Sequence, residues 1–320
     1  MASFETFSNV LTTFRIVDYL LCAILALTGM IIARNVRPHC RPFSWNDTTI
    51  AYDYAGNEAY PSWSLIFIAI LPVVVYATVE FIRALLWRAG TTLSADMAPL
   101  DAELNPVTVD VAGQEGTTVR RLRVENVNSG VPGASEGEEG REGTLGAGTR
   151  WSLFTEKLNH WVLAQAFAVC LCLCIVDVTK VYAGRLRPDF LARLLRAGYN
   201  KESEGVDWCY VALGGRKSFP SGHSGVAFAS VVTLVLYCLG QLQAFHFASL
   251  WRTVMSLLLL ILPIAVAVSR TRDNRHHFSD ILAGSVIGTC CALFSVTLLF
   301  RLSGRTGFFL PRRLDYALKR

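Results

Sequence analysis

Two histidines and a carboxylate lie among basic residues at three places in this sequence, and these residue types suit phosphoryl transfer. The clusters occupy residues 180–188, 220–223 and 269–280. Lys180, Arg187 and Arg270 supply fixed positive charge, and a guanidinium can hold two oxygens of one phosphate at once. If the three clusters meet in space, they would bind a phosphoryl group.

The two histidines can divide the covalent chemistry between them. His276 and Asp280 are four residues apart, so they share a helix face if the last helix begins a turn early, and the carboxylate would then fix the imidazole tautomer. This favours His276 as a nucleophile that forms a phosphohistidine, while His223 protonates the leaving alkoxide and later activates water. Ser221 and Gly222 would hold phosphate oxygens, because backbone amides at a helix start attract anions.

Each cluster alone also fits a structural role. Basic residues beside a membrane helix contact headgroups, a Pro-Ser-Gly-His run can cap a helix, and a histidine and an aspartate four apart can form a capping pair. The conjunction of all three on one membrane face favours a functional site. Four further residues are secondary candidates, as rim contacts or solvated charge: Arg185, Arg272, Arg275 and His277.

No metal and no cofactor are expected, because fixed cations already oppose the charge of the transition state. Cys170, Cys172 and Cys174 have a spacing that invites a zinc assignment. However, no histidine or carboxylate accompanies them, and alternate residues do not share a helix face. We expect these cysteines to pack as small apolar side chains.

Apolar segments must position the three clusters. Apolar residues make up 52% of the 320 residues and charged residues 17%, which is typical of an integral membrane protein. Runs of about 18 to 20 apolar residues can cross the hydrocarbon core as helices. We expect an all-α single domain over 1–320 with six transmembrane helices, at about 16–33, 65–87, 161–178, 224–242, 250–268 and 281–300. The first is interpreted as a retained helix, since it lacks signal-peptide features.

Six alternating helices place the three clusters on one face of the membrane and both termini on the other. Cys40 and Cys209 lie in loops on the clusters' face, so they are a candidate disulfide that would require an oxidising compartment. Asn46 begins a sequon in the first loop, and its glycosylation would make that face luminal or extracellular. The balance of lysine and arginine is nearly equal on the two sides and does not decide orientation.

The segment 88–157 is rich in glycine and acidic residues, and we expect a disordered cytosolic insert with unknown partners. The net charge of +5 is modest, and the basic residues gather in loops, which argues against nucleic acid as a partner. The expected partners are the bilayer and a membrane lipid phosphate, with homo-oligomerisation left open.

The three clusters resemble the three-part signature of the phosphatidic acid phosphatase type 2 superfamily, which includes vanadium haloperoxidases. Residues 180–188, 215–224 and 269–280, with the six-helix layout, are similar to the lipid phosphate phosphatase branch. The resemblance implies a bundle of that type and the same roles as above. The residues are Lys180, Arg187, Ser221, Gly222 and Arg270 for phosphate, His276 as nucleophile, Asp280 orienting it and His223 as acid.

The resemblance further implies a metal-independent phosphatidate phosphatase that releases diacylglycerol and phosphate. Lysophosphatidate, diacylglycerol pyrophosphate and sphingosine phosphate are further substrates of that branch. It also implies cytosolic termini and a luminal or extracellular catalytic face, in the plasma membrane or the endoplasmic reticulum. The alternatives are a polyprenyl pyrophosphate or sphingoid-base phosphate phosphatase and, from another class, a non-catalytic scaffold or transporter.

Overall fold

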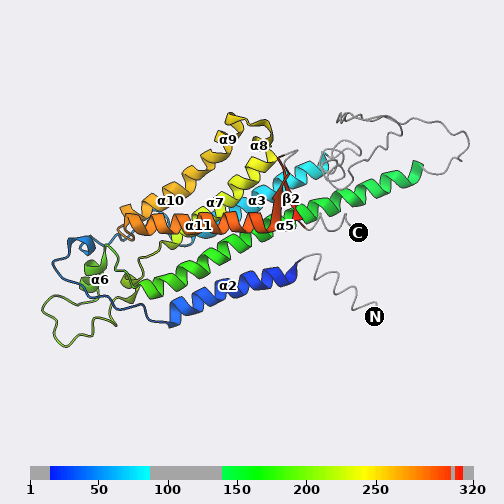
Figure 1. Ribbon diagram of the computed structural model, residues 1–320. Helices are drawn as coiled ribbons and strands as arrows, with labels where there is room; N and C mark the ends of the chain where they lie inside the picture. The colour runs from blue at the N-terminus through cyan, green and yellow to red at the C-terminus, as the bar shows by residue number, and fades with distance from the viewer. Residues whose placement is uncertain (1–14, 87–138, 304–306, 313–320) are drawn as a thin grey trace, which may run out of the picture.

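The computed structural model describes residues 15–86, 139–303 and 307–312. Long helices run side by side in a bundle, with short elements at both ends (Figure 1). The helices are α2 (Ile16–Asn35), α3 (Ser64–Leu85), α5 (Glu139–Ala183), α6 (Phe190–Arg196), α7 (Gly222–Gln241), α8 (Ala244–Phe247), α9 (Leu250–Leu257), α10 (Ile261–Arg272) and α11 (Phe278–Leu299). The 3-10 helices are η1 (Thr48–Ile50), η2 (Leu213–Arg216) and η3 (Leu258–Leu260). Strands β1 (Phe300–Leu302) and β2 (Phe309–Pro311) pair antiparallel, with Phe300 opposite Pro311.

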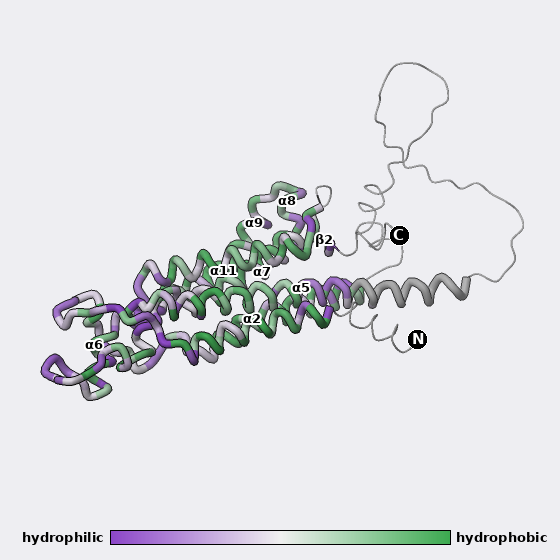
Figure 2. The backbone as a smooth tube through the Cα atoms, turned by 60° about the horizontal axis from the view of Figure 1, so that its bottom comes forward, coloured by the Kyte–Doolittle hydropathy of each residue, from purple (hydrophilic) through white to green (hydrophobic). Residues whose placement is uncertain are grey.

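Six helical segments in the described part of the chain are long and apolar enough to cross a membrane: Ile16–Asn35, Ser64–Leu85, Phe154–Ala183, Gly222–Gln241, Leu250–Arg272 and Phe278–Leu299. Figure 2 shows apolar residues along these helices and polar residues towards the ends of the bundle. Large apolar side chains such as Leu20, Phe67 and Leu282 face outwards, as lipid contact requires. The six expected spans are confirmed, and the chain is a multi-pass membrane protein.

Helix α5 begins within the segment where the sequence pattern placed the insert. This helix begins at Glu139, so residues 139–157 are helical, whereas the remainder of the expected insert, from residue 88, lies outside the described residues. A transmembrane helix supplies the costly nucleus, and each further turn then adds little cost. The glycine-rich composition of this stretch hid the extension.

The fifth span also differs in detail, because it consists of α9, η3 and α10 in succession. Helix α10 continues to Arg272, so Ser269 and Arg270 lie on this helix. The sequence pattern had placed them in the turn that follows the fifth span. Positive side chains near a helix C-terminus interact favourably with the carbonyl end of the helix. The turn between the last two spans therefore contains only residues 273–277.

Helix α7 lies at the centre of the bundle and packs against α11 with backbone-to-backbone contact. A Cβ atom at Gly284 of α11 would overlap the carbonyl oxygen of Ser221, and one at Gly288 would overlap that of Gly225. Only glycine permits so close an approach, which maximises van der Waals contact in a membrane. This contact holds the starts of α7 and α11 next to one another.

Glu80 of α3 is a charged residue within a span, and it is buried in a polar network. Its carboxylate accepts hydrogen bonds from Tyr237 Oη at 3.1 Å and Gln241 Nε2 at 3.0 Å. Arg83 Nη1 lies 3.8 Å from the same oxygen, as the spacing of these two residues predicts. The paired and hydrogen-bonded carboxylate is thereby tolerated inside the membrane.

Three connections gather at one end of the bundle, which is the left end in Figure 1. They are the 36–63 loop, the 184–221 loop with α6, and the 273–277 turn. The beginning of α2 and the strand pair lie at the opposite end. All the residues singled out for chemistry are therefore on one side of the bundle.

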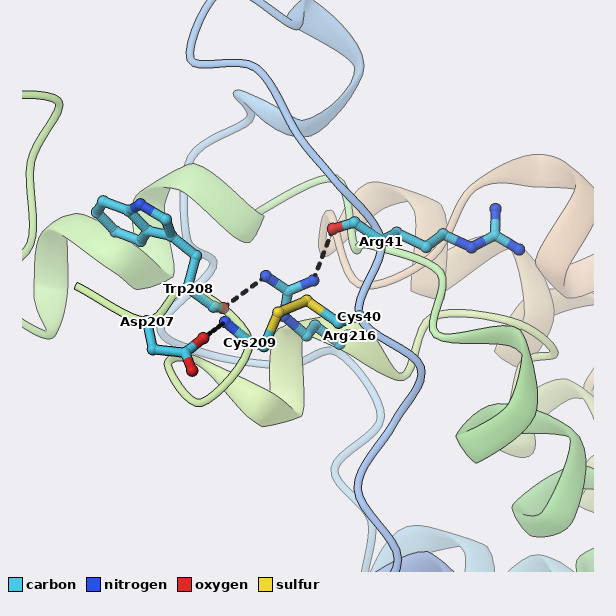
Figure 3. The surroundings of a disulfide bond; sticks show 6 residues. All are labelled: Cys40, Arg41, Asp207, Trp208, Cys209 and Arg216. Atoms are coloured by element: carbon cyan, nitrogen blue, oxygen red, sulfur yellow. Dashed lines mark hydrogen bonds between the residues drawn. A yellow bond between two sulfur atoms is a disulfide. The ribbon is translucent and has the colours of Figure 1, made fainter. Parts of the chain in front are cut away.

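A disulfide joins the first two of these connections. Cys40 and Cys209 are bonded, with their Cα atoms 5.3 Å apart (Figure 3). Beside this bond, the Arg216 guanidinium donates to the carbonyl oxygens of Arg41 at 2.9 Å and Trp208 at 2.7 Å. Asn46 is exposed on the first loop at the same end.

Candidate active site

The three sequence clusters meet through backbone hydrogen bonds at this end of the bundle. Ser221 N donates to Asp280 O at 2.9 Å, which joins the start of α7 to the start of α11. Arg187 N donates to Gly215 O at 2.8 Å, which joins the first cluster to the segment before α7. The clusters are thus parts of one local structure.

His276 is buried immediately before α11, and its ring is oriented by a backbone carbonyl. Its Nδ1 lies 2.6 Å from Ser218 O and 3.8 Å from Asp280 Oδ2. Because a carbonyl oxygen can only accept, Nδ1 carries the hydrogen and Nε2 keeps its lone pair. The tautomer that a nucleophile needs is therefore held by Ser218.

This arrangement corrects the expected pairing of His276 and Asp280 on one helix face. α11 begins at Phe278 and His277 is its N-cap, so His276 precedes the helix. Asp280 is on the first turn, where its carboxylate accepts the His277 backbone N–H at 2.9 Å. The two residues are neighbours, but through a capped helix start.

Asp280 is fully buried and connects all three clusters. Its carboxylate accepts from Ser218 Oγ at 2.6 Å and from Arg185 Nη1 at 2.7 Å. Asp280 therefore holds Ser218, whose carbonyl holds His276. Ser218 lies in the 215–224 segment that carries the resemblance, but it was given no role from the sequence, because a backbone carbonyl leaves no mark in residue types.

Burial keeps His276 in its neutral form. Desolvation lowers its pKa to about 4, and the nearby positive charges of Arg187 and Lys180 act in the same direction, whereas Asp280 opposes them. Burial also lowers the pKa of Arg187 to about 10, which leaves its guanidinium charged at neutral pH. A neutral imidazole beside fixed cations suits nucleophilic attack on an anion.

Lys180 and Arg187 lie where the first cluster meets the start of α7. Lys180 Nζ is 3.7 Å from Asp177 Oδ1, and a Cβ atom added at Gly222 would lie 2.8 Å from that Nζ. Arg187 Nε and His223 Nε2 are both buried and have no hydrogen-bond partner among the described residues. A bound anion would give the Arg187 nitrogen an acceptor, and a catalytic role would explain the free nitrogen of His223.

Ser221 caps α7 but does not offer the free amide that the sequence pattern suggested. Its backbone N–H is already donated to Asp280 O. Its side-chain oxygen accepts from Ser224 Oγ at 3.1 Å and from Ser224 N at 3.4 Å. The Ser221 hydroxyl hydrogen is the group that it can give to an anion.

Arg270 is buried on α10 and bound to carboxylates. Its Nη1 donates to Glu58 Oε2 at 2.9 Å and its Nη2 to Asp273 Oδ2 at 2.7 Å. Arg275 binds the other oxygen of Glu58 at 2.8 Å. Glu58 lies in the first loop, outside the three clusters, and sequence reasoning missed it because no motif marks it.

The four secondary candidates separate in the structure. Arg185 bonds Asp280, and Arg275 is buried beside Glu58, so both belong to the site. His277 caps α11 and its Nε2 lies 3.1 Å from Leu186 O, which is a structural role. Arg272 is exposed.

A family model described as the PAP2 superfamily matches residues 161–303 of the chain. The PAP2 match includes the three clusters and ends with the last span. Glu58 and the first two spans of the chain lie outside the matched region.

Curated relatives match the chain over less than half of its length. A PA-phosphatase related-family protein of Dictyostelium discoideum is 40% identical over 134 residues, which cover 41% of this chain and 45% of the relative. Lipid phosphate phosphatase 1 of Arabidopsis thaliana is 38% identical over 154 residues, with 43% and 44% covered. Diacylglycerol pyrophosphate phosphatase 1 of Saccharomyces cerevisiae is 35% identical over 134 residues, with 38% and 45% covered. The match spans less than half the length of each relative, and no solved structure matches.

Proposed function

We propose that this protein is a lipid phosphate phosphatase that hydrolyses phosphatidic acid to diacylglycerol and phosphate. The observation that carries the proposal is the buried, neutral His276, with Nδ1 bonded to Ser218 O, beside the cationic groups of Lys180 and Arg187. The PAP2 match and the names of the relatives support a lipid phosphate as substrate. Lysophosphatidate, diacylglycerol pyrophosphate and sphingosine phosphate are further candidate substrates.

In the first proposed step, His276 Nε2 attacks the phosphorus atom. A P–N bond forms while the P–O bond to the glycerol oxygen breaks, and His223 gives a proton to the leaving oxygen. Lys180, Arg187 and Arg270 would hold the equatorial oxygens, with the Ser221 hydroxyl as a further donor. These fixed charges supply the electrostatic stabilisation that a metal ion gives in other phosphatases.

In the second proposed step, the phosphohistidine is hydrolysed. His223, now neutral, takes a proton from a water molecule as the water oxygen attacks phosphorus. The P–N bond breaks, its electron pair returns to His276 Nε2, and inorganic phosphate leaves. Ser218 O keeps the Nδ1 hydrogen in place through both steps, so that the same tautomer is regenerated.

We place the catalytic face in the lumen or outside the cell and the termini in the cytosol. The Cys40–Cys209 disulfide supports this orientation because such bonds persist in oxidising compartments. The exposed Asn46 sequon at the same end also supports it. The plasma membrane and the endoplasmic reticulum both fit, and a glycosidase-sensitive shift in mass that is lost in Asn46→Gln would test the orientation.

The function is tested with purified protein in detergent, phosphatidate in mixed micelles and an excess of chelator. We expect release of free phosphate, and a loss of about 10³-fold or more in His276→Ala, because the nucleophile is removed. The matched control is His246→Ala, which changes an exposed histidine at the opposite end of the bundle. A native protein that releases no phosphate would instead indicate a scaffold or transporter. Release that requires metal would contradict the mechanism.

A panel of substrates under the same conditions decides the lipid class. Faster release from a polyprenyl pyrophosphate or from a sphingoid-base phosphate than from phosphatidate would replace the proposed substrate. The covalent chemistry would be unaffected, since it concerns the phosphoryl group and not the lipid tail.

A further inference from the structure

Glu58 is the one residue of the first loop that bonds two arginines of the candidate site. Its Oε2 accepts a hydrogen bond from Arg270 at 2.9 Å, and its Oε1 forms an ion pair with Arg275 Nη2 at 2.8 Å. A carboxylate held by two guanidiniums through its two oxygens resembles, in charge and geometry, a bound phosphate. Glu58 therefore occupies donors that a phosphoryl group would use.

The backbone around Glu58 is fixed to the turn before His276. Ala59 N donates to Asp273 Oδ2 at 2.9 Å, and Asn274 Nδ2 donates to Asp53 O at 3.0 Å. The Arg275 guanidinium also stacks on the Tyr54 ring, 4.8 Å from its centroid. These contacts hold the 53–59 segment in place, so the Glu58 side chain is presented at the site by a fixed backbone.

The two carboxylates bound to Arg270 differ in their freedom to leave it. Asp273 is buried and also accepts the Ala59 backbone N–H, so it belongs to the framework. The Glu58 side chain is 25% exposed, whereas that of Arg270 is 1% exposed. Glu58 can therefore swing towards solvent and free Nη1, while Asp273 stays.

We infer that Glu58 competes with phosphate for Arg270 and Arg275 and so sets how tightly the site holds anions. The inference rests on the proposed function of the site. A negative charge next to the phosphate position weakens anion binding, and it weakens binding of the small product as well as of the substrate headgroup. Glu58 would thus favour release of inorganic phosphate from a pocket that is otherwise strongly cationic.

The test compares Glu58→Gln with Glu202→Gln, which removes the same charge from an exposed position in the 184–221 loop. The measurement is the inhibition constant of inorganic phosphate against phosphatidate hydrolysis, together with the thermal shift that phosphate produces. We expect Glu58→Gln to lower the inhibition constant by about tenfold, which corresponds to about 1.4 kcal/mol. Glu202→Gln should change it by less than about twofold, since exposed charges are screened.

The outcomes separate the inference from the proposed function. An inhibition constant that is unchanged or raised in Glu58→Gln, in a protein that still hydrolyses phosphatidate, overturns the competition and makes Glu58 a positioning residue for the arginines. Glu58→Asp keeps the charge with a shorter reach, so it should stay within about threefold of the native value if charge is the cause. A native protein that neither binds phosphate nor hydrolyses phosphatidate would instead refute the proposed function, and the inference with it.

Discussion

Replacing Asp280 with asparagine discriminates between two ways of holding the nucleophile. Asp280 accepts hydrogen bonds from Arg185, Ser218 and the His277 backbone, but its carboxylate lies 3.8 Å from His276 Nδ1. That nitrogen instead donates to Ser218 O at 2.6 Å. The carbonyl remains in Asp280→Asn, so the correct tautomer should survive the substitution.

The magnitude follows from what Asp280→Asn removes. Where a carboxylate alone sets the tautomer, amide replacement costs about 10⁴ in kcat. Here we expect a loss of about 10²-fold, or about 2.7 kcal/mol, because Ser218 loses a charged partner and its carbonyl shifts. Losing one hydrogen bond to a charged group should also lower the free energy of unfolding by about 1.5–3 kcal/mol.

The assay is kcat with saturating phosphatidate, measured alongside thermal unfolding in detergent for the native protein and Asp280→Asn. Ser218→Ala is the companion variant, since it keeps the carbonyl and removes only the hydroxyl that Asp280 holds. Its kcat should fall less than that of Asp280→Asn, because Arg185 and the helix cap retain the carboxylate. A folded Asp280→Asn protein with kcat reduced by about 10⁴ would refute the reasoning and return the tautomer to direct control by Asp280.

Three further predictions follow from the same geometry. Burial lowers the pKa of His276 to about 4, so the lone pair of its Nε2 is available above that pH. The value of kcat/KM should therefore fall only as the pH approaches about 4. A fall centred near pH 6.5 in the pH–rate profile would contradict this prediction. Gly222→Ala should displace the Lys180 ammonium, which lies 2.8 Å from the added Cβ, and raise KM for phosphatidate about tenfold. Thermal unfolding should change little, because the flexible lysine side chain can move. An unchanged KM would show that Lys180 does not bind phosphate. Cys40→Ser should lower the free energy of unfolding by about 2–4 kcal/mol and so lower the unfolding temperature. Reductant should lower the unfolding temperature of the native protein to the same extent and leave that of the variant unchanged.

The spans were predictable because hydrophobic length is a local property of the sequence. Each of the six apolar runs became a helix at nearly the expected place. The extent of α5 was not predictable, since its first residues continue a helix that the membrane span nucleates, and their own composition favours disorder. The break at η3 was also hidden within a uniformly apolar run.

The site was predictable where residue types carry the chemistry and unpredictable where the fold does. Lys180, His223 and His276 were marked by charge, by imidazole and by their place beside spans. The carbonyl of Ser218 orients His276 only because the backbone before α7 passes that ring. Glu58 reaches Arg270 across more than two hundred residues of sequence, by a loop path that no local pattern encodes.

The glycine contact between α7 and α11 determines which parts of the bundle can move. Two helices whose backbones touch at Gly284 and Gly288 cannot slide or rotate against one another without collision of main-chain atoms. The start of α7, with Ser221 and His223, and the start of α11, with Asp280, therefore move as one rigid body. A motion that lets a lipid with two acyl chains enter the site must then involve the neighbouring helices or the first loop. The distances between the groups on α7 and α11 stay the same during such a motion.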